Sequence, residues 1–536
     1  MSDTNVSLNE IQSMQTTVRP DKIALIFPAQ QMQYTYAALE SRSNQVAAWL
    51  LSLGLQEGDG IAMLMENRPE LMEIALAATK IGIYFTPMST HLASDEIAHI
   101  LVDSDAKVLI VSNYTMEEAN NLHALHREGG ARPSLMVFSV DGETDGFLSY
   151  ASGVSATPPL AELPQRAKGR VMLYSSGTTG KPKGIRRPLI PHEKRHLPDP
   201  AVAGWRKMFE IDSDAVYLCP APLYHAAPLV YVMRMLDMGA TAVVMLKFDA
   251  ELALSMIQTH RVTHSQWVPT MFVRMLELPP SIRAKYDLSS MKAAVHAAAP
   301  CPVHVKRAML DWWGDIIHEY YAGSETVGTT WINAKEWLQH PGSVGRPITG
   351  QVHIVSDEGE ELGSNQIGKV YFSGGPQFAY WNDTKKTQSA FNEKGWATYG
   401  DIGHLDEDGY LFLSDRRDDL ILSGGVNVYP FEIESVMSRH PEVQDVAVVG
   451  VPHPVFGELP KAIVHLRDGV TADAATAQRI LDFTAQHLAK IKLPKTIVFE
   501  SGLPRLETGK LLRRILKQRY RDQPEAGFVV TASGGS

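Results

Sequence analysis

Short β-rich runs alternate with amphipathic helical runs along most of the chain, and this alternation limits the possible fold more than any single motif. A helical pattern at 36–53 is followed by a strand pattern at 60–64 and a second helical pattern at 70–82. Apolar residues recur at helical spacing in the longer runs, whereas the short runs are apolar and β-branched. Strands that are joined through helices pair in parallel, so the sequence predicts an α/β fold with layered, largely parallel sheets.

The same alternation returns in the middle of the chain. Strand, helix, strand and helix patterns occupy residues 215–219, 228–238, 242–246 and 250–260. The segment 187–205 is rich in proline, histidine and charge, and we expect it to be a loop. After residue 342 the strand patterns become shorter, and turn signals at 357–359 and 407–409 predict hairpin-type connections.

A separate small domain is predicted at the C-terminal end. Pro430 can open a helix, because the first turn of a helix tolerates proline. The expected helix, two strands and second helix cover residues 431–439, 445–451, 461–466 and 472–488. These elements suffice for an α+β domain of about 115 residues. The charged run 416–419 separates the two patterned regions, so we predict domains of 1–417 and 418–536.

Composition excludes several classes of protein. The net charge of −10 comes without a basic stripe, which argues against a nucleic-acid partner. Two cysteines, Cys219 and Cys301, exclude a disulfide framework and a cysteine-rich zinc site. The sequence has no secretory signal pattern and no apolar run of about 18 residues, so we expect a cytoplasmic protein without an integral membrane segment.

Residues 174–184, with the sequence YSSGTTGKPKG, combine hydroxyls, glycines and lysines at high density. Glycines let backbone N–H groups approach an anion, hydroxyls donate to phosphate oxygens, and a lysine neutralises their charge. The run therefore predicts a phosphate-binding loop, the alternative being a solvated turn. It is not a Walker A loop, because Pro182 stands where that motif requires serine or threonine. The candidate phosphate ligands are Ser175, Ser176, Gly177, Thr178, Thr179 and Lys183.

This run resembles the signature loop of the adenylate-forming superfamily, which includes acyl- and aryl-CoA ligases, adenylation domains of peptide synthetases and beetle luciferase. The resemblance implies a large N-terminal domain of layered α/β subdomains and a small, mobile α+β C-terminal domain. It also implies a small-molecule carboxylic acid, ATP with Mg²⁺, and coenzyme A as the reacting partners. Further motifs, in the family's order, extend the resemblance to residue 510.

Residues 320–326, YYAGSET, combine an aromatic side chain with a hydroxyl and a carboxylate. An aromatic face can stack on a base, and a carboxylate can hold Mg²⁺, although a tyrosine is as readily a core residue. The run resembles the family's Tyr-Gly-x-Thr-Glu motif. That resemblance assigns Tyr321 to the adenine, Ser324 to the α-phosphate and Glu325 to Mg²⁺.

Two shorter motifs resemble the family's adenine-pocket turn and its ribose site. Residues 297–300, AAAP, are similar to Gly-Ala-Ala-Pro, which implies that Ala298 lines the adenine site. Residues 399–403, YGDIG, resemble the Thr-Gly-Asp motif, with Tyr399 in the threonine position. The resemblance assigns Asp401 to the ribose hydroxyls, a role that suits an acceptor-only carboxylate.

The region 416–430 resembles the family's hinge. The resemblance assigns Arg416 to the ribose, Asp418 to the hinge itself, and Gly424 and Gly425 to the pantetheine arm of coenzyme A. A hinge would let one site serve two half-reactions.

Two further residues complete the candidate site. Lys510 follows a Thr-Gly turn and resembles the family's catalytic C-terminal lysine, although a lone lysine is usually a solvated surface charge. His225 follows Pro-Leu-Tyr and resembles a histidine that borders the family's acyl pocket, although such a histidine is often a core residue.

Together these motifs predict an AMP-forming acid–thiol ligase. The acid would first become an acyl-adenylate with loss of pyrophosphate, and coenzyme A would then displace AMP. Three alternatives stay open: transfer to a carrier protein, a luciferase-like oxidative fate, and a non-catalytic nucleotide-binding scaffold. Small side chains at Ala293, Ala294, Ala297 and Ala298 favour a bulky acid, such as a fatty, aryl or steroid side-chain acid. The sequence leaves the oligomeric state open, a homodimer included.

Overall fold

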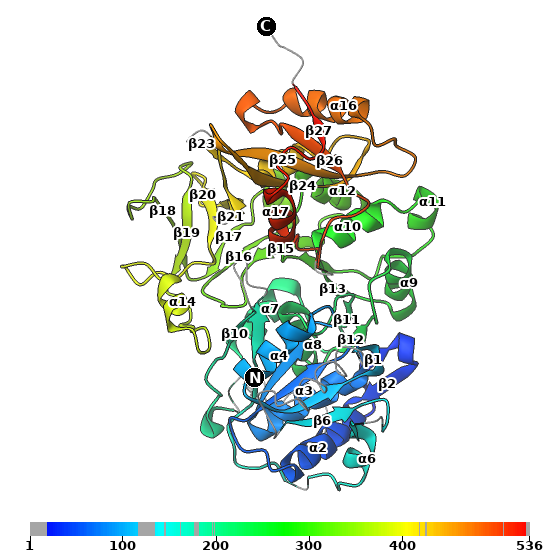
Figure 1. Ribbon diagram of the computed structural model, residues 1–536. Coiled ribbons are helices and arrows are strands. Elements are labelled where there is room, and N and C mark those ends of the chain that lie inside the picture. Colours follow the sequence, from blue (N-terminus) through cyan, green and yellow to red (C-terminus); the bar gives the residue numbers. More distant parts are fainter. Residues whose placement is uncertain are drawn as a thin grey trace. The chain divides into compact units, whose positions relative to one another are not determined.

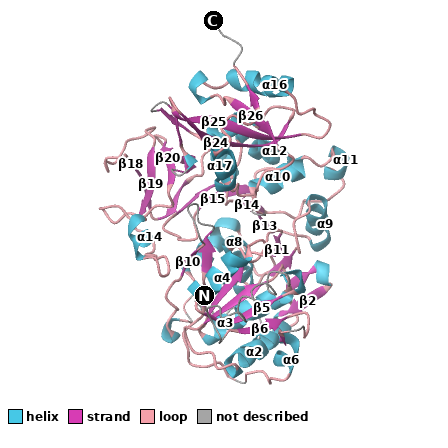
Figure 2. Cartoon of the chain, in the orientation of Figure 1, coloured by secondary structure: helices cyan, strands magenta, loops and turns pink. Residues whose placement is uncertain are grey.

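A computed structural model of the chain describes residues 19–115, 135–143, 146–160, 162–175, 182–195, 197, 199–416, 419–423, 426–506 and 509–531. The chain forms two compact units (Figure 1). The first comprises residues 1–267, 277–295 and 378–388, and the second comprises 268–276, 296–377 and 389–536. Both units contain helices and strands (Figure 2). In the part of the chain that the structure describes, no helix is long and apolar enough to cross a membrane.

The first unit contains a sheet of parallel strands with the order β7, β6, β5, β3, β4, β8. In that order the strands are Leu148–Ser149, Met136–Ser139, Ala106–Val111, Gly60–Leu64, Tyr84–Met88 and Arg170–Val171. The neighbouring helices are α2 (Tyr36–Ser52), α3 (Pro69–Ile81), α4 (Ser94–Asp103) and α6 (Tyr150–Ser155). Ile97 and Ile100 of α4 pack against Leu64 and Leu109 in one buried cluster. The predicted strand and helices of this region are confirmed to within one residue at each end.

A second run of strands in this unit has the order β14, β13, β11, β12, β1, β2. The strands are Ala293–His296, His264–Trp267, Val216–Cys219, Thr241–Val244, Ile23–Phe27 and Met32–Thr35. Strands β11, β12, β13 and β1 pair in parallel, and β1 pairs with β2 antiparallel. The helices are α7 (Pro200–Phe209), α8 (Ala226–Asp237), α9 (Ala250–His260), α11 (Pro280–Arg283) and α14 (Thr384–Ser389). The predicted parallel α/β layers are therefore confirmed.

The prediction of a loop over 187–205 is wrong in its last part, where helix α7 begins at Pro200. The side chain of Asp199 caps this helix, because its carboxylate accepts a hydrogen bond from the backbone N–H of Ala201 at 2.9 Å. Aspartate at the N-cap followed by proline is a favourable helix start. The segment as a whole has a loop-like composition, so the sequence analysis did not recognise this helix start.

The second unit begins with antiparallel strands. Strands β15 (Ile317–Tyr321), β16 (Thr329–Ile332) and β17 (Arg346–Thr349) pair in this order. A separate antiparallel sheet consists of β18 (Gln351–Val355), β19 (Gly368–Ser373), β20 (Asp401–Leu405) and β21 (Leu411–Arg416). Helices α10 (Pro269–Leu276), α12 (Val303–Trp313) and α13 (Ala334–Gln339) belong to the same unit. Both predicted turns are present, and Gly359 and Gly409 take the positive φ angles that favour glycine.

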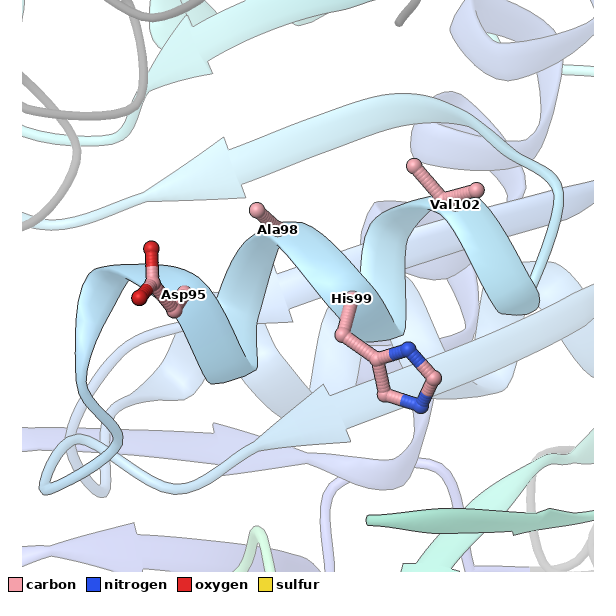
Figure 3. A pocket seen from close by; sticks show the side chains of 4 residues that line it. All are labelled: Asp95, Ala98, His99 and Val102. Atoms are coloured by element: carbon pink, nitrogen blue, oxygen red, sulfur yellow. The ribbon is translucent and has the colours of Figure 1, made fainter. Parts of the chain in front are cut away.

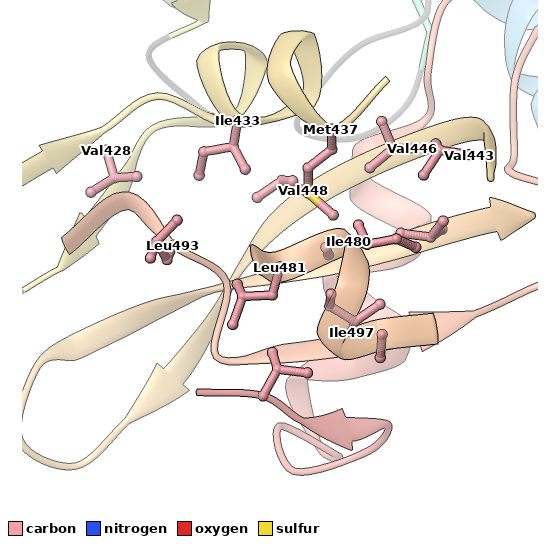
Figure 4. Packing of buried hydrophobic residues seen from close by; sticks show 14 of the residues in the cluster. Val428, Ile433, Met437, Val443, Val446, Val448, Ile480, Leu481, Leu493 and Ile497 are labelled. Carbon is pink, nitrogen blue, oxygen red and sulfur yellow. The ribbon is translucent and has the colours of Figure 1, made fainter. Parts of the chain in front are cut away.

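The C-terminal elements form an α+β arrangement, as predicted. The strand order is β23, β22, β25, β26, β27, and β24 pairs with β25. These strands are Val426–Val428, Ile421–Ser423, Gly457–Leu466, Thr496–Phe499, Phe528–Val529 and, for β24, Val443–His453. Helices α15 (Pro430–Met437) and α16 (Ala474–Ala485) pack buried side chains such as Ile433 and Ile480 against the sheet (Figure 4). Helix α17 (Arg513–Arg521) follows. The predicted boundary at 417–418 lies outside the described residues and stays a prediction.

A buried ion pair lies between helix α12 and strand β15. Lys306 Nζ is 2.5 Å from the Glu319 carboxylate, and both side chains are almost completely buried. His296, at the end of β14, is fully buried beside the pair, with Nε2 3.4 Å from the same carboxylate. Burial holds the pKa of His296 well below its usual range, and Lys306 adds to this effect, so the imidazole is neutral.

Replacing one partner of this pair should destabilise the protein strongly. Lys306→Met leaves the Glu319 carboxyl buried without its cation, a change that typically costs about 3–5 kcal/mol. The double replacement Lys306→Met with Glu319→Leu should recover much of this loss, because it leaves no buried charge. Thermal unfolding by calorimetry would measure both. Lys285→Met, which removes an exposed partner of Glu251, is the matched control and should leave the melting temperature unchanged. Equal effects of Lys306→Met and Lys285→Met would contradict the prediction.

Candidate functional site

The predicted phosphate loop joins two strands of a small hairpin in the first unit. Strands β9 (Leu173–Ser175) and β10 (Lys183–Ile185) pair antiparallel, with Ser175 opposite Lys183. The pairing brings the first and last candidate ligands of the loop together. Lys183 is half-buried, and its Nζ lies 3.9 Å from Asp383 Oδ2, a loose ion pair. Ser176, Gly177, Thr178 and Thr179 lie outside the described residues.

Several contacts fix the position of this hairpin. The Tyr174 hydroxyl donates to the Asp103 carboxylate at 2.7 Å, and the Trp381 indole N–H donates to the Asp103 carbonyl oxygen at 2.8 Å. The backbone N–H of Trp381 donates to the Gly184 carbonyl oxygen at 2.8 Å. The Arg186 guanidinium lies 4.1 Å from the ring centroids of both Tyr84 and Trp381. A guanidinium between two aromatic faces is held by cation–π attraction, so the strand after the loop is firmly anchored.

Helix α4 also contacts the end of the loop. His99 and the Pro182 carbonyl oxygen are 3.0 Å apart, a hydrogen-bond distance. Asp95, Ala98, His99 and Val102 recur at helical spacing along α4 and line a shallow hollow (Figure 3). Because His99 contacts the end of the loop, we assign it to support of the loop.

The second unit brings the predicted adenine and ribose residues together. Tyr321 is the last residue of β15, and its hydroxyl donates a hydrogen bond to the Asp401 carboxylate. Asp401 is the first residue of β20, and in the sheet it lies opposite Arg416 of β21. The side chain of Arg416 lies outside the described part of the structure. A carboxylate, a phenol and the end of a strand thus converge at one edge, an arrangement that suits the hydroxyls of a sugar.

Two aromatic residues that sequence analysis did not assign to the site surround Tyr321. The ring centroids of Tyr399 and Phe372 lie 5.5 Å and 6.2 Å from that of Tyr321. The Tyr399 ring stands at 84° to the Tyr321 ring, an edge-to-face contact that aromatic rings prefer. Burial raises the pKa of Tyr399 to about 12, so its hydroxyl stays protonated at physiological pH. Tyr399 occupies the threonine position of the family motif, but nothing in the local pattern of Phe372 marked it.

The turn after β15 carries Ser324 and Glu325, both of them half-buried. A Cβ atom on Gly323 would come 2.8 Å from Glu325 Oε2, so the carboxylate lies over this glycine. Thr326 has a φ of 53°, and Ala298, after β14, has a φ of 75°. Left-handed backbone at a residue other than glycine is sparse and concentrates at functional sites.

Lys510 lies on a tight turn that its neighbours hold. The backbone N–H of Leu506 donates to the Lys510 carbonyl oxygen at 2.9 Å, and Gly509 has a φ of 75°. Arg505 forms two hydrogen bonds with Asp445 at 2.7 and 2.8 Å and a third with the Gly509 carbonyl oxygen. The Lys510 side chain is half-buried. The predicted hinge and pantetheine residues Asp418, Gly424 and Gly425 lie outside the described residues.

His225 immediately precedes helix α8 in the first unit. Its ring is half-buried and lies 4.7 Å from that of Tyr224. Partial exposure leaves the imidazole accessible to a ligand, and its role at an acyl pocket stays a prediction.

Comparison with known proteins assigns most of the chain to one family of enzymes. The family described as "AMP-binding enzyme" matches residues 13–379, and "AMP-binding enzyme C-terminal domain" matches residues 432–510. The long-chain-fatty-acid–CoA ligase FadD13 of Mycobacterium tuberculosis is 32% identical over 94% of this chain and 96% of that protein. A second ligase of that organism, for 3-[(3aS,4S,7aS)-7a-methyl-1,5-dioxo-octahydro-1H-inden-4-yl]propanoyl:CoA, is 32% identical over 93% of this chain and 96% of its own length.

A solved structure with a similar fold gives the same family assignment. The ATP-bound crystal structure of MatB from Rhodopseudomonas palustris has a TM-score of 0.79 and 27% identity, and the match covers 97% of this chain and 99% of MatB. The chain therefore belongs to the AMP-binding enzyme family, in the acyl-CoA synthetase branch of the adenylate-forming superfamily, and is an AMP-forming acid–CoA ligase.

Proposed function

We propose that the chain activates a bulky carboxylic acid. We also propose that one set of the residues named above serves adenylation and that another set serves thioester formation. The observation that carries this proposal is the contact between the Tyr321 hydroxyl and the Asp401 carboxylate, opposite Arg416. It places the aromatic and acidic groups for a nucleoside side by side.

The chemistry explains why a nucleotide is needed. A carboxylate is a poor electrophile because its charge repels nucleophiles. When a carboxylate oxygen attacks the α-phosphorus of ATP, an acyl-adenylate forms and pyrophosphate leaves. The sulfur of coenzyme A, as thiolate, then attacks the acyl carbon, and AMP leaves with the electron pair of the broken carbon–oxygen bond.

The first half-reaction would use several of the residues described above. Tyr321 and Ala298 would border the adenine, and Asp401 and Arg416 would bind the ribose. Ser324 would donate to the α-phosphate. Within the phosphate loop the proposed ligands are Ser175, Ser176, Gly177, Thr178, Thr179 and Lys183. Backbone amides and hydroxyls suit this task because they donate to phosphate oxygens without adding bulk.

Glu325 would hold the Mg²⁺ that accompanies ATP. Hard oxygen ligands suit Mg²⁺, and the carboxylate lies over Gly323, where a side chain would displace it. When bound, the ion neutralises phosphate charge. Lys510 would stabilise the negative charge that develops as the carboxylate attacks, and His225 would border the acyl group.

The second half-reaction would use the small domain differently. Asp418 would act as the hinge between the two domains, and Gly424 and Gly425 would leave room for the pantetheine arm of coenzyme A. We also propose that the enzyme is cytoplasmic and that it forms a homodimer. Light scattering on the purified protein would test the homodimer.

The relatives support a bulky acid. Side-chain volume does not add to this support, because Ala298 is exposed after β14 whereas Ala293, Ala294 and Ala297 are buried. The two Mycobacterium tuberculosis relatives are named for a long-chain fatty acid and for a fused-ring propanoic acid. Both acids are far larger than acetate.

Incubation with MgATP and a panel of acids, from acetate to long-chain, aryl and steroid side-chain acids, would test the substrate class. Mass spectrometry should find acyl-CoA and AMP with one or more of the bulky acids, and only when coenzyme A is present. A clear preference for acetate would overturn the substrate proposal. Acyl-AMP that accumulates equally with and without coenzyme A would instead point to a carrier-protein acceptor.

Lys510→Ala should separate the half-reactions. Loss of an ammonium aimed at developing charge should lower the rate of adenylation on the order of 10²–10³-fold. Thioester formation from preformed acyl-AMP and coenzyme A should stay near the wild-type rate. Stopped-flow pyrophosphate release and chromatography of the thioester would measure the two steps. Lys490→Ala, at an exposed lysine of the same domain, is the control and should change neither. Equal loss of both steps in Lys510→Ala would contradict the proposed division.

A further inference from the structure

We propose that Tyr399 is a positioning residue for the turn 323–328, and that it aligns Ser324 and Glu325 for MgATP by holding both ends of that turn. The proposal rests on the function proposed above, because Ser324 and Glu325 are assigned to the α-phosphate and to Mg²⁺ there. It extends that function to a residue that would act through the turn.

The hydroxyl of Tyr399 holds the C-terminal end of the turn. It donates a hydrogen bond to the Gly328 carbonyl oxygen at 2.8 Å and accepts one from the Gly328 N–H at 3.3 Å. Both backbone groups of one residue are thus satisfied by a single phenol. Because burial raises the pKa of Tyr399 to about 12, the hydroxyl remains a donor throughout the physiological range.

The ring of the same tyrosine holds the N-terminal end. A Cβ atom on Gly323 would come 2.4 Å from Tyr399 Cε1 and 2.8 Å from Glu325 Oε2. Only glycine allows the ring, the backbone and the Glu325 carboxylate to meet there. One side chain therefore contacts the first and the last residue of the turn that presents Ser324 and Glu325.

Phe372 completes the support from the neighbouring strand β19. Its ring centroid lies 5.7 Å from that of Tyr399. A Cβ atom on Gly328 would come 1.9 Å from Phe372 Cδ1, so this glycine also packs directly on an aromatic ring. Tyr399 in turn contacts Tyr321 edge to face, which links the turn to the proposed adenine residue.

The turn needs such support because its backbone is strained. Thr326 follows Glu325 and has a φ of 53°, in a region that β-branched residues rarely occupy. Such a conformation persists only where the surroundings impose it. Two hydrogen bonds and a ring contact from the half-buried Tyr399 side chain impose it here.

The threonine of the family motif is too short for this task. Its side chain carries no ring that could reach Gly323 while its hydroxyl contacts Gly328. The tyrosine at position 399 therefore gives this chain a means of fixing the turn that the motif residue does not supply.

Tyr399→Phe tests the proposal, because it keeps the ring and removes both hydrogen bonds to Gly328. Isothermal titration would measure the Kd for MgATP in the absence of any acid. Pyrophosphate release would give kcat and KM for adenylation, and a third assay would follow thioester formation from synthetic acyl-AMP and coenzyme A. Calorimetry would give the melting temperature.

We expect the Kd and KM for MgATP to rise about tenfold and kcat for adenylation to fall about 10- to 100-fold, as for a misplaced reacting group. Thioester formation from acyl-AMP should fall less than adenylation, because that step needs no Mg²⁺ or outer phosphates and depends on the turn only through the Ser324 contact with the α-phosphate. The matched control is Tyr371→Phe, at the residue before Phe372 on the other face of β19, and it should leave all values unchanged.

Other results would overturn the proposal. Unchanged Kd and kcat in Tyr399→Phe would show that the hydroxyl does not position the turn. Equal loss of both half-reactions with a lower melting temperature would show a structural role alone. If the wild-type protein binds MgATP but adenylates no acid, the proposed function is refuted. The Kd for MgATP of Tyr399→Phe, compared with that of the wild type, would then decide the role of Tyr399. Absence of MgATP binding to the wild type would overturn both.

Discussion

The contact between Tyr321 and Asp401 ties strand β15 to the separate antiparallel sheet of β18 to β21, and the proposed nucleotide site depends on this link. Tyr321 ends the strand β15, and Asp401 begins β20 in the other sheet. A hydrogen bond from a phenol to a carboxylate is charge-assisted and therefore stronger than a neutral one. It fixes where one strand ends relative to the start of the other, and thereby the place at which a base and a ribose can bind side by side.

A group of buried polar side chains restrains the end of β15 that carries Tyr321. Glu319 lies two residues before Tyr321, on the same face of β15, and its carboxylate is paired with Lys306 of α12. His296 ends the strand that leads to Ala298, and it lies beside the same pair. A buried pair contributes little net stability compared with apolar packing, but breaking it is costly. The pair therefore restricts the ways in which α12, β14 and β15 can pack, and with them the ends that carry Tyr321 and Ala298.

The sequence predicted the periodic parts of this fold, and its motifs singled out Tyr321 and Asp401, which the structure brings into contact. The strand 60–64 and the helix 250–260 agree with the structure because their apolar spacing is regular. Helix α7 was missed because its start depends on Asp199 and Pro200 within a segment of loop-like composition. Contacts between distant residues could not be predicted at all. Trp381 bonds to Asp103 across 278 positions, and Phe372 contacts Gly328 within no recognisable motif.

The backbone contacts beside Lys510 bear on the proposed mobility of the C-terminal domain. A lysine side chain is flexible, and holding it in one geometry costs conformational entropy. The structure places most of the order in the backbone instead, since Arg505 joins Asp445 to the Gly509 carbonyl oxygen, and Gly509 takes a conformation that few other residues adopt. When the ammonium meets developing charge, only its own rotamers remain to be ordered. Under the proposed hinge model, these backbone contacts keep the lysine aligned for the reaction while the domain that carries it moves.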